Sequence, residues 1–176
     1  MPLNINQLFV NYCLSNDLEE IKYLLKNYSI NIHYNNEDGF ISACRNGYLD
    51  IVKYLITLYL NDIRYKHINI HIQNEAAFKY ACAGGHINVV KYLVSLHNYH
   101  SRYSRININI GNECGFTNAC KNMHFNVIIF LMKLYKQKYK PINTNINLTE
   151  YNDIIKKYLI NTSVIGNYSK LSKIFI

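Results

Sequence analysis

The sequence predicts an all-α solenoid, in which similar helix–turn–helix units stack side by side and are joined by short extended or β-hairpin arms. Three observations support this fold class. The sequence repeats itself at an interval of 38 residues, apolar residues within each copy follow helical spacing, and polar and apolar residues alternate between copies. One such unit cannot bury its own apolar face, so neighbouring units must stack. We expect a single domain over residues 1–176.

The internal repeat rests on a short motif that recurs in register. Asn36–Cys44 aligns with Asn74–Cys82 and with Asn112–Cys120, and a further copy lies 31 residues upstream of the first, around Phe9 and Cys13. The first and last units are degenerate, as expected for the caps of a repeat stack. The expected units are about residues 5–33, 34–71, 72–109 and 110–147, with a degenerate fifth unit as a C-terminal cap at residues 148–176.

Each copy is predicted to begin with a short helix. Phe40, Ala43 and Cys44 lie at positions i, i+3 and i+4, which places them in one stripe of that helix. Asn36, followed by Glu37, supplies a side-chain oxygen and a negative charge that suit a helix N-terminus. We therefore expect the helix to start at about Asn36.

A second and longer helix is predicted after a tight turn. Gly47 is expected to end the first helix, because glycine is favoured just past a helix C-terminus. Leu49, Val52 and Leu55 then fall on one face of the second helix, whereas Lys53 falls on another. The apolar face is expected to form the core between units.

A polar–apolar alternation precedes each helix pair. The segments Ile30–His33, Ile68–His71 and Ile106–Asn109 all begin with Ile, Asn and Ile. Alternation with a period of two indicates an extended segment rather than a helix. We therefore expect a short extended or β-hairpin arm at each junction.

The segment Ala81–Leu93 resembles the second half of an ankyrin repeat, including its Gly-His turn at Gly85 and His86. The resemblance covers about residues 5–145 and implies a stack with an extended concave binding surface. It also implies that His86 bonds to backbone carbonyls. The Asn, Ile, Lys and Tyr bias and the Phe-x-x-Ala-Cys helix are similar to those of ankyrin proteins of giant amoeba-infecting viruses.

The first half of each unit departs from the family pattern. Asp38–Ile41, Ala76–Lys79 and Cys114–Thr117 occupy the positions of the family's Thr-Pro-Leu-His segment. Phe takes the place of the packing Leu, and the Thr and His that form hydrogen bonds between repeats in the family are missing. We therefore expect reduced rigidity between repeats.

Four cysteines recur in one frame of the repeat, which raises the possibility of disulfides or a metal ladder. Packed helices lie about 8–10 Å apart, whereas a disulfide needs Cα atoms within roughly 7 Å. Small buried thiols are therefore the favoured interpretation, and Cys114, which lies outside the frame, is expected to be exposed. The recurring cysteines are Cys13, Cys44, Cys82 and Cys120.

Catalytic and metal-binding patterns are not evident. The sequence has no Gly-rich phosphate loop, no G-x-S-x-G elbow and no H-E-x-x-H helix. Cys82 with His86, and Cys120 with His124, are spaced as possible metal ligands, but no Cys-x-x-Cys accompanies them. We expect a protein that is not an enzyme and that needs neither a cofactor nor a metal.

Composition and charge limit where the chain is expected to reside and which partners it could have. No stretch approaches the roughly 18 consecutive apolar residues of a membrane helix, and residues 1–10 lack the basic region of a secretory signal. We expect an intracellular monomer without a membrane-spanning segment. The net charge is −2 over residues 1–60, +3 over residues 61–120 and +7 over residues 121–176. Such asymmetry fits either a solvated basic end or an anionic partner.

Five residues beyond the usual ankyrin length fall at the same place in each unit, within the insertions Tyr59–His67, His97–Arg105 and Tyr135–Pro141, which mix aromatic with basic side chains. They either extend the second helix with a soluble end or form a ridge that could hold phosphates and bases. Nucleic-acid or polyanion binding is therefore the alternative function. Its candidate residues are Arg64, Lys66, Arg102, Arg105, Lys138 and Lys140.

Non-catalytic binding of a partner protein, possibly one of a host cell, is the favoured function. The ankyrin resemblance places the contact residues on the concave face of the stack, at positions that packing leaves variable. These candidate residues are Tyr34, Asn35, Glu37, Arg45, Asn46, Gln73, Glu75, Glu113, Lys121 and Asn122.

Overall fold

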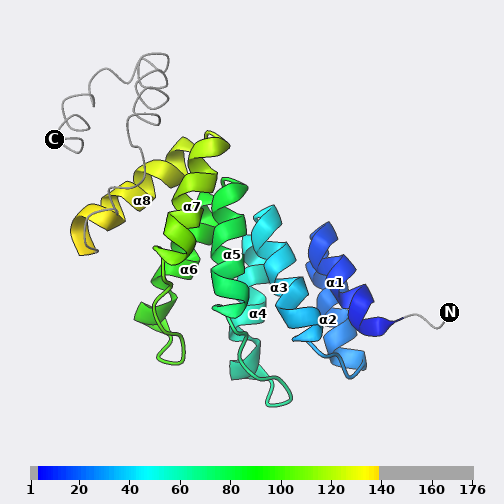
Figure 1. Ribbon diagram of the computed structural model, residues 1–176. Coiled ribbons are helices and arrows are strands. Elements are labelled where there is room, and N and C mark those ends of the chain that lie inside the picture. The colour runs from blue at the N-terminus through cyan, green and yellow to red at the C-terminus, as the bar shows by residue number, and fades with distance from the viewer. Residues whose placement is uncertain (1–3, 139–176) are drawn as a thin grey trace.

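A computed structural model describes residues 4–138 as a row of four antiparallel helix pairs (Figure 1). The bounds are α1 Ile5–Ser15, α2 Leu18–Asn27, α3 Tyr34–Asn46, α4 Leu49–Asn61, α5 Ile72–Ala83, α6 Ile87–Tyr99, α7 Ile110–Lys121 and α8 Phe125–Lys138. The described part is therefore an all-α repeat fold. The expected cap at residues 148–176 lies outside it.

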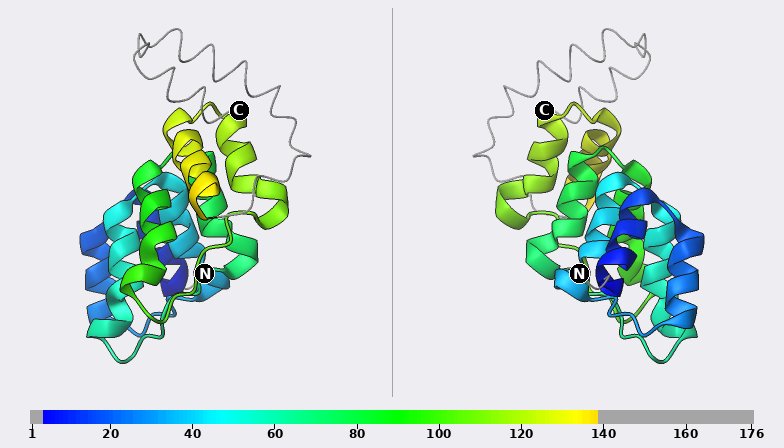
Figure 2. Two further views of the ribbon diagram at one scale, coloured as in Figure 1. Left: turned by 90° about the vertical axis from the view of Figure 1, so that its left-hand side faces the viewer. Right: turned by 90° about the vertical axis from the view of Figure 1, so that its right-hand side faces the viewer.

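The helices form two layers, which Figure 2 shows from the two ends of the row. The first helices of the pairs pack side by side, with α3 against both α1 and α5 and with α5 against α7. The second helices form the other layer, where α6 contacts α4 and α8. No helix in the described range is both long and apolar enough to cross a membrane.

Close packing of the first helices explains the Phe in each repeat. Phe9, Phe40, Phe78 and Phe116 are each 0% exposed. A Cβ atom added at Gly39 would lie only 2.7 Å from Cε1 of Phe9, so the large ring of one repeat fits against a small residue of the next. Burying a phenyl ring in this way contributes about 2–3 kcal/mol of hydrophobic stabilisation per residue.

The second helices bury the face that the sequence predicted. Leu55, Leu93 and Leu131 are at most 1% exposed, whereas Lys53 is exposed. The predicted helix stop at Gly47 is also confirmed, since this residue caps α3 with a φ of 78°. Helical spacing and glycine therefore located the buried face of the second helix and the end of the first helix correctly.

The junctions between pairs are extended, but no β-strand is assigned anywhere in residues 4–138. Ile30 and Ile32 are buried and Asn31 is exposed, as alternation predicted. The Asn31 carbonyl accepts from the Tyr34 amide at 3.0 Å, and its side chain accepts from the His33 amide at 3.0 Å. The chain turns directly into the next helix, so the expected β-hairpin is not confirmed.

The start of α3 differs from the prediction. Asn35, Asn36 and Glu37 have φ values of 54°, 60° and 65°, and form one left-handed turn before the right-handed helix. Gln73–Glu75 repeat this conformation in α5. Asn36 is therefore not an N-cap. Asparagine tolerates left-handed backbone well, but glutamate does not, so tertiary contacts must hold Glu37 in place.

Candidate functional site

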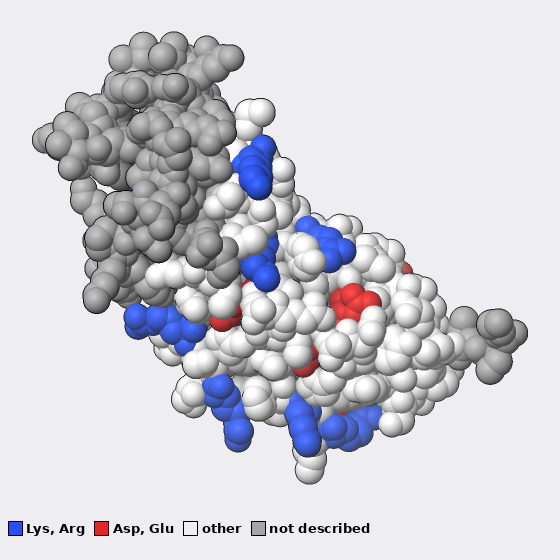
Figure 3. All heavy atoms as spheres, in the orientation of Figure 1, with Lys and Arg blue, Asp and Glu red and all other residues white. Residues whose placement is uncertain are grey.

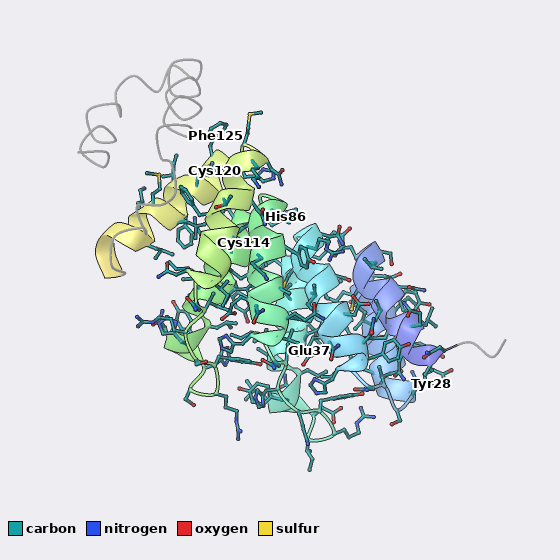
Figure 4. All side chains as sticks on the ribbon, in the orientation of Figure 1. Tyr28, Glu37, His86, Cys114, Cys120 and Phe125 are labelled. Carbon is teal, nitrogen blue, oxygen red and sulfur yellow. The ribbon has the colours of Figure 1, made fainter. Side chains whose placement is uncertain are left out.

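Each helix pair has two ends that differ in chemistry. The loop end carries the arms, the left-handed turns and the inserted residues, and the turn end carries the tight turns within the pairs. Figure 4 shows Glu37 at the lower, loop end of the helices and His86 at the upper, turn end. The loop end comprises residues 28–37, 59–75 and 97–110, and the turn end comprises residues 14–17, 45–48, 83–86 and 121–124.

Glu37 holds the arm that follows its helix pair at the loop end. Its side chain is buried, with 3% of the residue exposed. One carboxylate oxygen, Oε1, accepts from His33 Nδ1 at 2.8 Å and from the Asn69 amide of the next arm at 3.0 Å. Oε2 is buried without a hydrogen-bond partner. The carboxylate thus satisfies an arm amide that has no strand to pair with.

The same bond pattern recurs in the neighbouring repeats. Glu75 is 5% exposed, and its Oε1 accepts from His71 Nδ1 at 2.8 Å and from the Asn107 amide at 3.1 Å. In the first repeat, Asn6 takes the place of the glutamate and accepts from the Asn31 amide at 2.8 Å.

The burial of these glutamates removes them from the residues predicted to contact a partner. Glu37 and Glu75 were expected on the binding surface, but burial makes both unavailable to a partner. Their hydrogen bonds fix the arms that follow the second and third helix pairs, and the expected reduction in rigidity between repeats stays a prediction. The side chain of Glu113, in the same register, lies outside the described residues.

The inserted residues contain a second link between repeats. The Tyr65 hydroxyl is buried and donates to the Leu25 carbonyl at 3.2 Å, and the Tyr103 hydroxyl donates to the Ile56 carbonyl at 3.2 Å. Burial raises the pKa of Tyr103 strongly, which favours the protonated hydroxyl as the donor. Part of the aromatic content of the insertions is therefore structural.

The basic residues of the insertions are partly engaged as well. Arg64 forms an ion pair with Asp62 at 2.6 Å and donates to the Leu25 carbonyl at 2.8 Å. Arg102 lies over the Tyr59 ring, 6.0 Å from its centroid. Lys66 and Arg105 are exposed. Figure 3 shows Lys and Arg along the lower edge, but also higher on the same face.

The expected basic ridge therefore lacks Arg64, its first residue, as a free cation. The Arg64 side chain is 53% exposed but is paired with Asp62. Lys66, Arg102 and Arg105 form no ion pair with a described carboxylate and remain candidates for an anionic partner. The side chain of Lys138 and the whole of Lys140 lie outside the described residues.

The turn end is held by histidines. His86 Nε2 donates to the Arg45 carbonyl of the preceding repeat at 2.8 Å, and His124 Nε2 donates to the Ala83 carbonyl at 2.8 Å. This is the role that the ankyrin resemblance implied for His86. Residues 4–138 contain no group of three or more His, Cys, Asp or Glu side chains that could hold a metal.

The exposed side chains of the turn end are mostly free of internal ionic partners. The Arg45 guanidinium lies 4.0 Å from the centroid of the Tyr80 ring. Neither Arg45 nor Lys121 forms an ion pair with any described carboxylate. Asn46 bonds the Ser42 carbonyl at 2.9 Å, and Asn122 bonds the Ala83 carbonyl at 2.7 Å.

The remaining predicted contact residues lie at the loop end. The Tyr34 hydroxyl accepts from Asn4 at 3.1 Å, and Asn35 and Gln73 are exposed in the left-handed turns. Since Tyr34 begins α3 and Asn46 ends it, the predicted set is divided between the two ends of the helices. It does not form one compact cluster.

Sequence reasoning missed three exposed apolar residues, which lie near or just past the C-terminal ends of the first helices α1, α5 and α7. Leu14 is 43% exposed, Tyr80 39% and Met123 61%. Tyr80 could have been found from the repeat alignment, because Ser42 and Asn118 occupy its position in the neighbouring repeats. A large ring at a position otherwise held by small polar residues indicates a role outside the core.

The recurring cysteines are buried and free, as predicted. Burial raises the pKa of Cys13 to about 12, with a smaller effect from the Asp38 carboxylate, and raises that of Cys120 to about 12. Burial also raises the pKa of Cys44 and Cys82. Cys114 is partly exposed. These environments favour inert thiols in the repeat frame rather than nucleophiles.

Comparison with known proteins gives one result. Residues 9–109 match a family described as ankyrin repeats in three copies. No curated protein and no solved structure matches the chain.

Proposed function

The chain belongs to the ankyrin-repeat family, and from this premise we propose that it binds a partner protein through the turn end of its first helices. Ankyrin repeats generally mediate protein–protein interactions and are typically non-catalytic. The observation that carries the proposal is Arg45, exposed on α3, which stacks on Tyr80 of α5 and has no ionic partner within the described residues.

The composition of this surface supports protein recognition. Tyr and Arg are enriched among the residues that dominate binding energy at protein interfaces. Asn46 and Asn122 add amide groups at equivalent positions of the second and fourth pairs. A host-cell protein as the partner remains a proposal that rests on the resemblance to viral ankyrin proteins.

Polyanion binding is retained as the competing outcome, because Lys66, Arg102 and Arg105 are exposed at the loop end. Arg64 does not support it, since this side chain is held by Asp62 and the Leu25 carbonyl. Phosphate contacts would make the affinity fall steeply with salt concentration.

A pair of multiple variants tests the proposal. The turn-end variant replaces Arg45, Asn46, Lys121 and Asn122 by Ala. The loop-end variant replaces Lys66, Arg102 and Arg105 by Gln and leaves Arg64 intact for stability. His124 still bonds the Ala83 carbonyl when Asn122 is replaced, so the turn-end variant keeps that acceptor satisfied.

Each tagged protein is used to capture partners from extract of the natural host cell, and captured proteins are identified by mass spectrometry. We expect the turn-end variant to lose the partner and the loop-end variant to retain it, since outlying charges mainly tune the association rate. Retained capture by a folded turn-end variant would contradict the proposal, as would nuclease-sensitive capture that only the loop-end variant loses.

A further inference from the structure

We infer that the partner presents an acidic peptide segment with apolar side chains, which binds across α1, α3, α5 and α7 at the turn end. This inference rests on the proposed function and specifies the chemistry of the partner. The surface concerned, called the turn-end patch, consists of Leu14, Arg45, Tyr80, Lys121 and Met123.

The charge of the first-helix layer is divided between its two ends. Its described acidic residues, Glu37, Asp38 and Glu75, all lie at or next to the loop end. Glu37 and Glu75 are buried, and the Asp38 carboxylate accepts from Asn35 and Ser42, each at 3.4 Å. The exposed charges at the other end of this layer are Arg45 and Lys121. The patch is therefore positive.

Acidic residues of the turn end belong to the other layer. Asp17 is the N-cap of α2 and accepts from the Glu20 amide at 3.2 Å. Glu19, Glu20 and Asp50 lie in the first turns of α2 and α4, and Glu19 is paired with Lys22 at 2.7 Å. None of these four carboxylates forms an ion pair with the cations of the patch, which leaves Arg45 and Lys121 available to carboxylates of another molecule.

The geometry of Arg45 favours a carboxylate as its ligand. Stacking on Tyr80 at 4.0 Å covers one face of the guanidinium, but leaves its N–H edge able to form paired hydrogen bonds with a carboxylate. The backbone beneath is held by His86, which bonds the Arg45 carbonyl. The stacking contact pre-orders the side chain and the His86 bond fixes its backbone, and a pre-ordered group loses less entropy on binding.

The apolar residues of the patch indicate that charge is not the whole of the recognition. Leu14, Tyr80 and Met123 are each at least 39% exposed. Single exposed apolar residues are ordinary, but here they occur with an arginine and a lysine on one layer of the fold. An acidic segment that also carries aromatic or aliphatic side chains matches both properties.

Nucleic acid matches the patch less well. Single-stranded nucleic acid binds by stacking its bases on aromatic rings along a basic groove, and one face of the Tyr80 ring is occupied by Arg45. The patch has two cations, whereas tight binding of a phosphate backbone depends on many such contacts.

A defined polymer tests the inference without knowledge of the partner. The probe is a fluorescein-labelled random copolymer of Glu and Tyr, and its binding to the full chain is followed by fluorescence polarisation. We expect the double variant Arg45→Glu with Lys121→Glu to weaken binding at least tenfold. The matched control, Lys53→Glu with Lys133→Glu, makes the same charge change on exposed positions of α4 and α8, and should change affinity less than threefold.

Further probes separate apolar recognition from charge alone. A poly-Glu chain of the same length should bind at least threefold more weakly than the copolymer. Tyr80→Ala should reduce this difference, since it removes both a ring contact and the support for Arg45. Circular dichroism spectra and thermal midpoints confirm that each variant is folded, and Arg45→Gln with Lys121→Gln provides a milder pair if the reversed charges unfold the protein.

Three results would overturn the inference: no binding of the copolymer, equal losses in the patch and control variants, or tighter binding of a labelled single-stranded oligonucleotide that the patch variant abolishes. The proposed function fails separately. If the turn-end Ala variant loses its cellular partner while the copolymer does not bind, the acidic chemistry is wrong and partner recognition at this end stands. If that variant keeps its partner, the proposed function itself is wrong.

Discussion

The two ends of the helix pairs use polar residues in opposite ways. At the loop end, Glu37 and Glu75 are buried and bond the next arm, and Tyr65 and Tyr103 bond the preceding repeat. At the turn end, histidines bond the backbone, while exposed side chains such as Arg45 have no described ionic partner.

This difference separates stability from recognition along the same helices. Polar groups that are buried and bonded stabilise the stack, because removing one partner leaves the other unsatisfied. Polar groups that remain exposed contribute little to stability, and can change without unfolding the protein. The buried polar groups of the loop end are therefore expected to be sensitive to substitution, and the exposed side chains of the turn end tolerant of it.

The largest effect is expected in the core that both ends share. Leu93 on α6 is 1% exposed, and Leu93→Ala should reduce the free energy of unfolding by about 2–5 kcal/mol. The exposed Lys53 is the control, since Lys53→Ala should change it by less than about 0.5 kcal/mol. Urea unfolding measures both. Equal effects would show that the face assigned to the second helices is wrong.

The next largest effect on the free energy of unfolding is expected when one residue from each end of the helix pairs is replaced in turn. Glu75→Ala removes the acceptor of the Asn107 amide and should lower the free energy of unfolding by about 2 kcal/mol. Arg45→Ala at the turn end should change it by less than about 0.5 kcal/mol. Glu75→Gln keeps one oxygen acceptor and should fall between them. A more destabilising Arg45→Ala would break the proposed division between the ends.

A smaller effect on stability is expected from the hydrogen bond of the Tyr103 hydroxyl. Tyr103→Phe removes one hydroxyl that donates to the Ile56 carbonyl, which should reduce the free energy of unfolding by about 1 kcal/mol. Tyr99, with 76% of its surface exposed, provides the matched Tyr→Phe control and should show no measurable change. Similar values for the two variants would remove Tyr103 from the inter-repeat contacts.

The last prediction concerns the reactivity of the cysteine thiols, which is measured without any substitution. With the pKa of Cys13 and Cys120 raised to about 12 and all four thiols of the repeat frame buried, these groups should react slowly at pH 8 in the folded protein. Ellman's reagent should find one fast site, Cys114, and five sites after denaturation. Several fast sites in the native protein would mean that the first-helix layer is loosely packed.

The regular part of this fold could be predicted from the sequence because it depends on local periodicity. The Phe40 and Cys44 stripe, the Leu93 face and the stop at Gly47 all follow from helical spacing and backbone preference. The turn histidine His86 followed from its place in the ankyrin pattern. These features need no knowledge of the neighbouring repeat.

The loop end could not be predicted in the same way, because its conformation depends on contacts between repeats. The left-handed turn ending at Glu37 is unfavourable for an isolated glutamate, and exists here with the carboxylate bonded to the next arm. A signal was present, since the pair Asn-Glu recurs at residues 36–37, 74–75 and 112–113, where the pattern of a helix start explains the recurrence of neither residue in a left-handed turn. Recurrence of a charged residue at one repeat position is consistent with a structural role.

The bonds that hold each arm to the helix pair before it also differ along the chain. The Asn31 amide is held by the neutral side chain of Asn6, whereas the Asn69 and Asn107 amides are held by buried carboxylates. A hydrogen bond to a charged acceptor is roughly twice as strong as a neutral one. Under a pulling force, the arm at Asn31 should therefore detach from its helix pair before the other two arms do, and optical-tweezer traces should show this order.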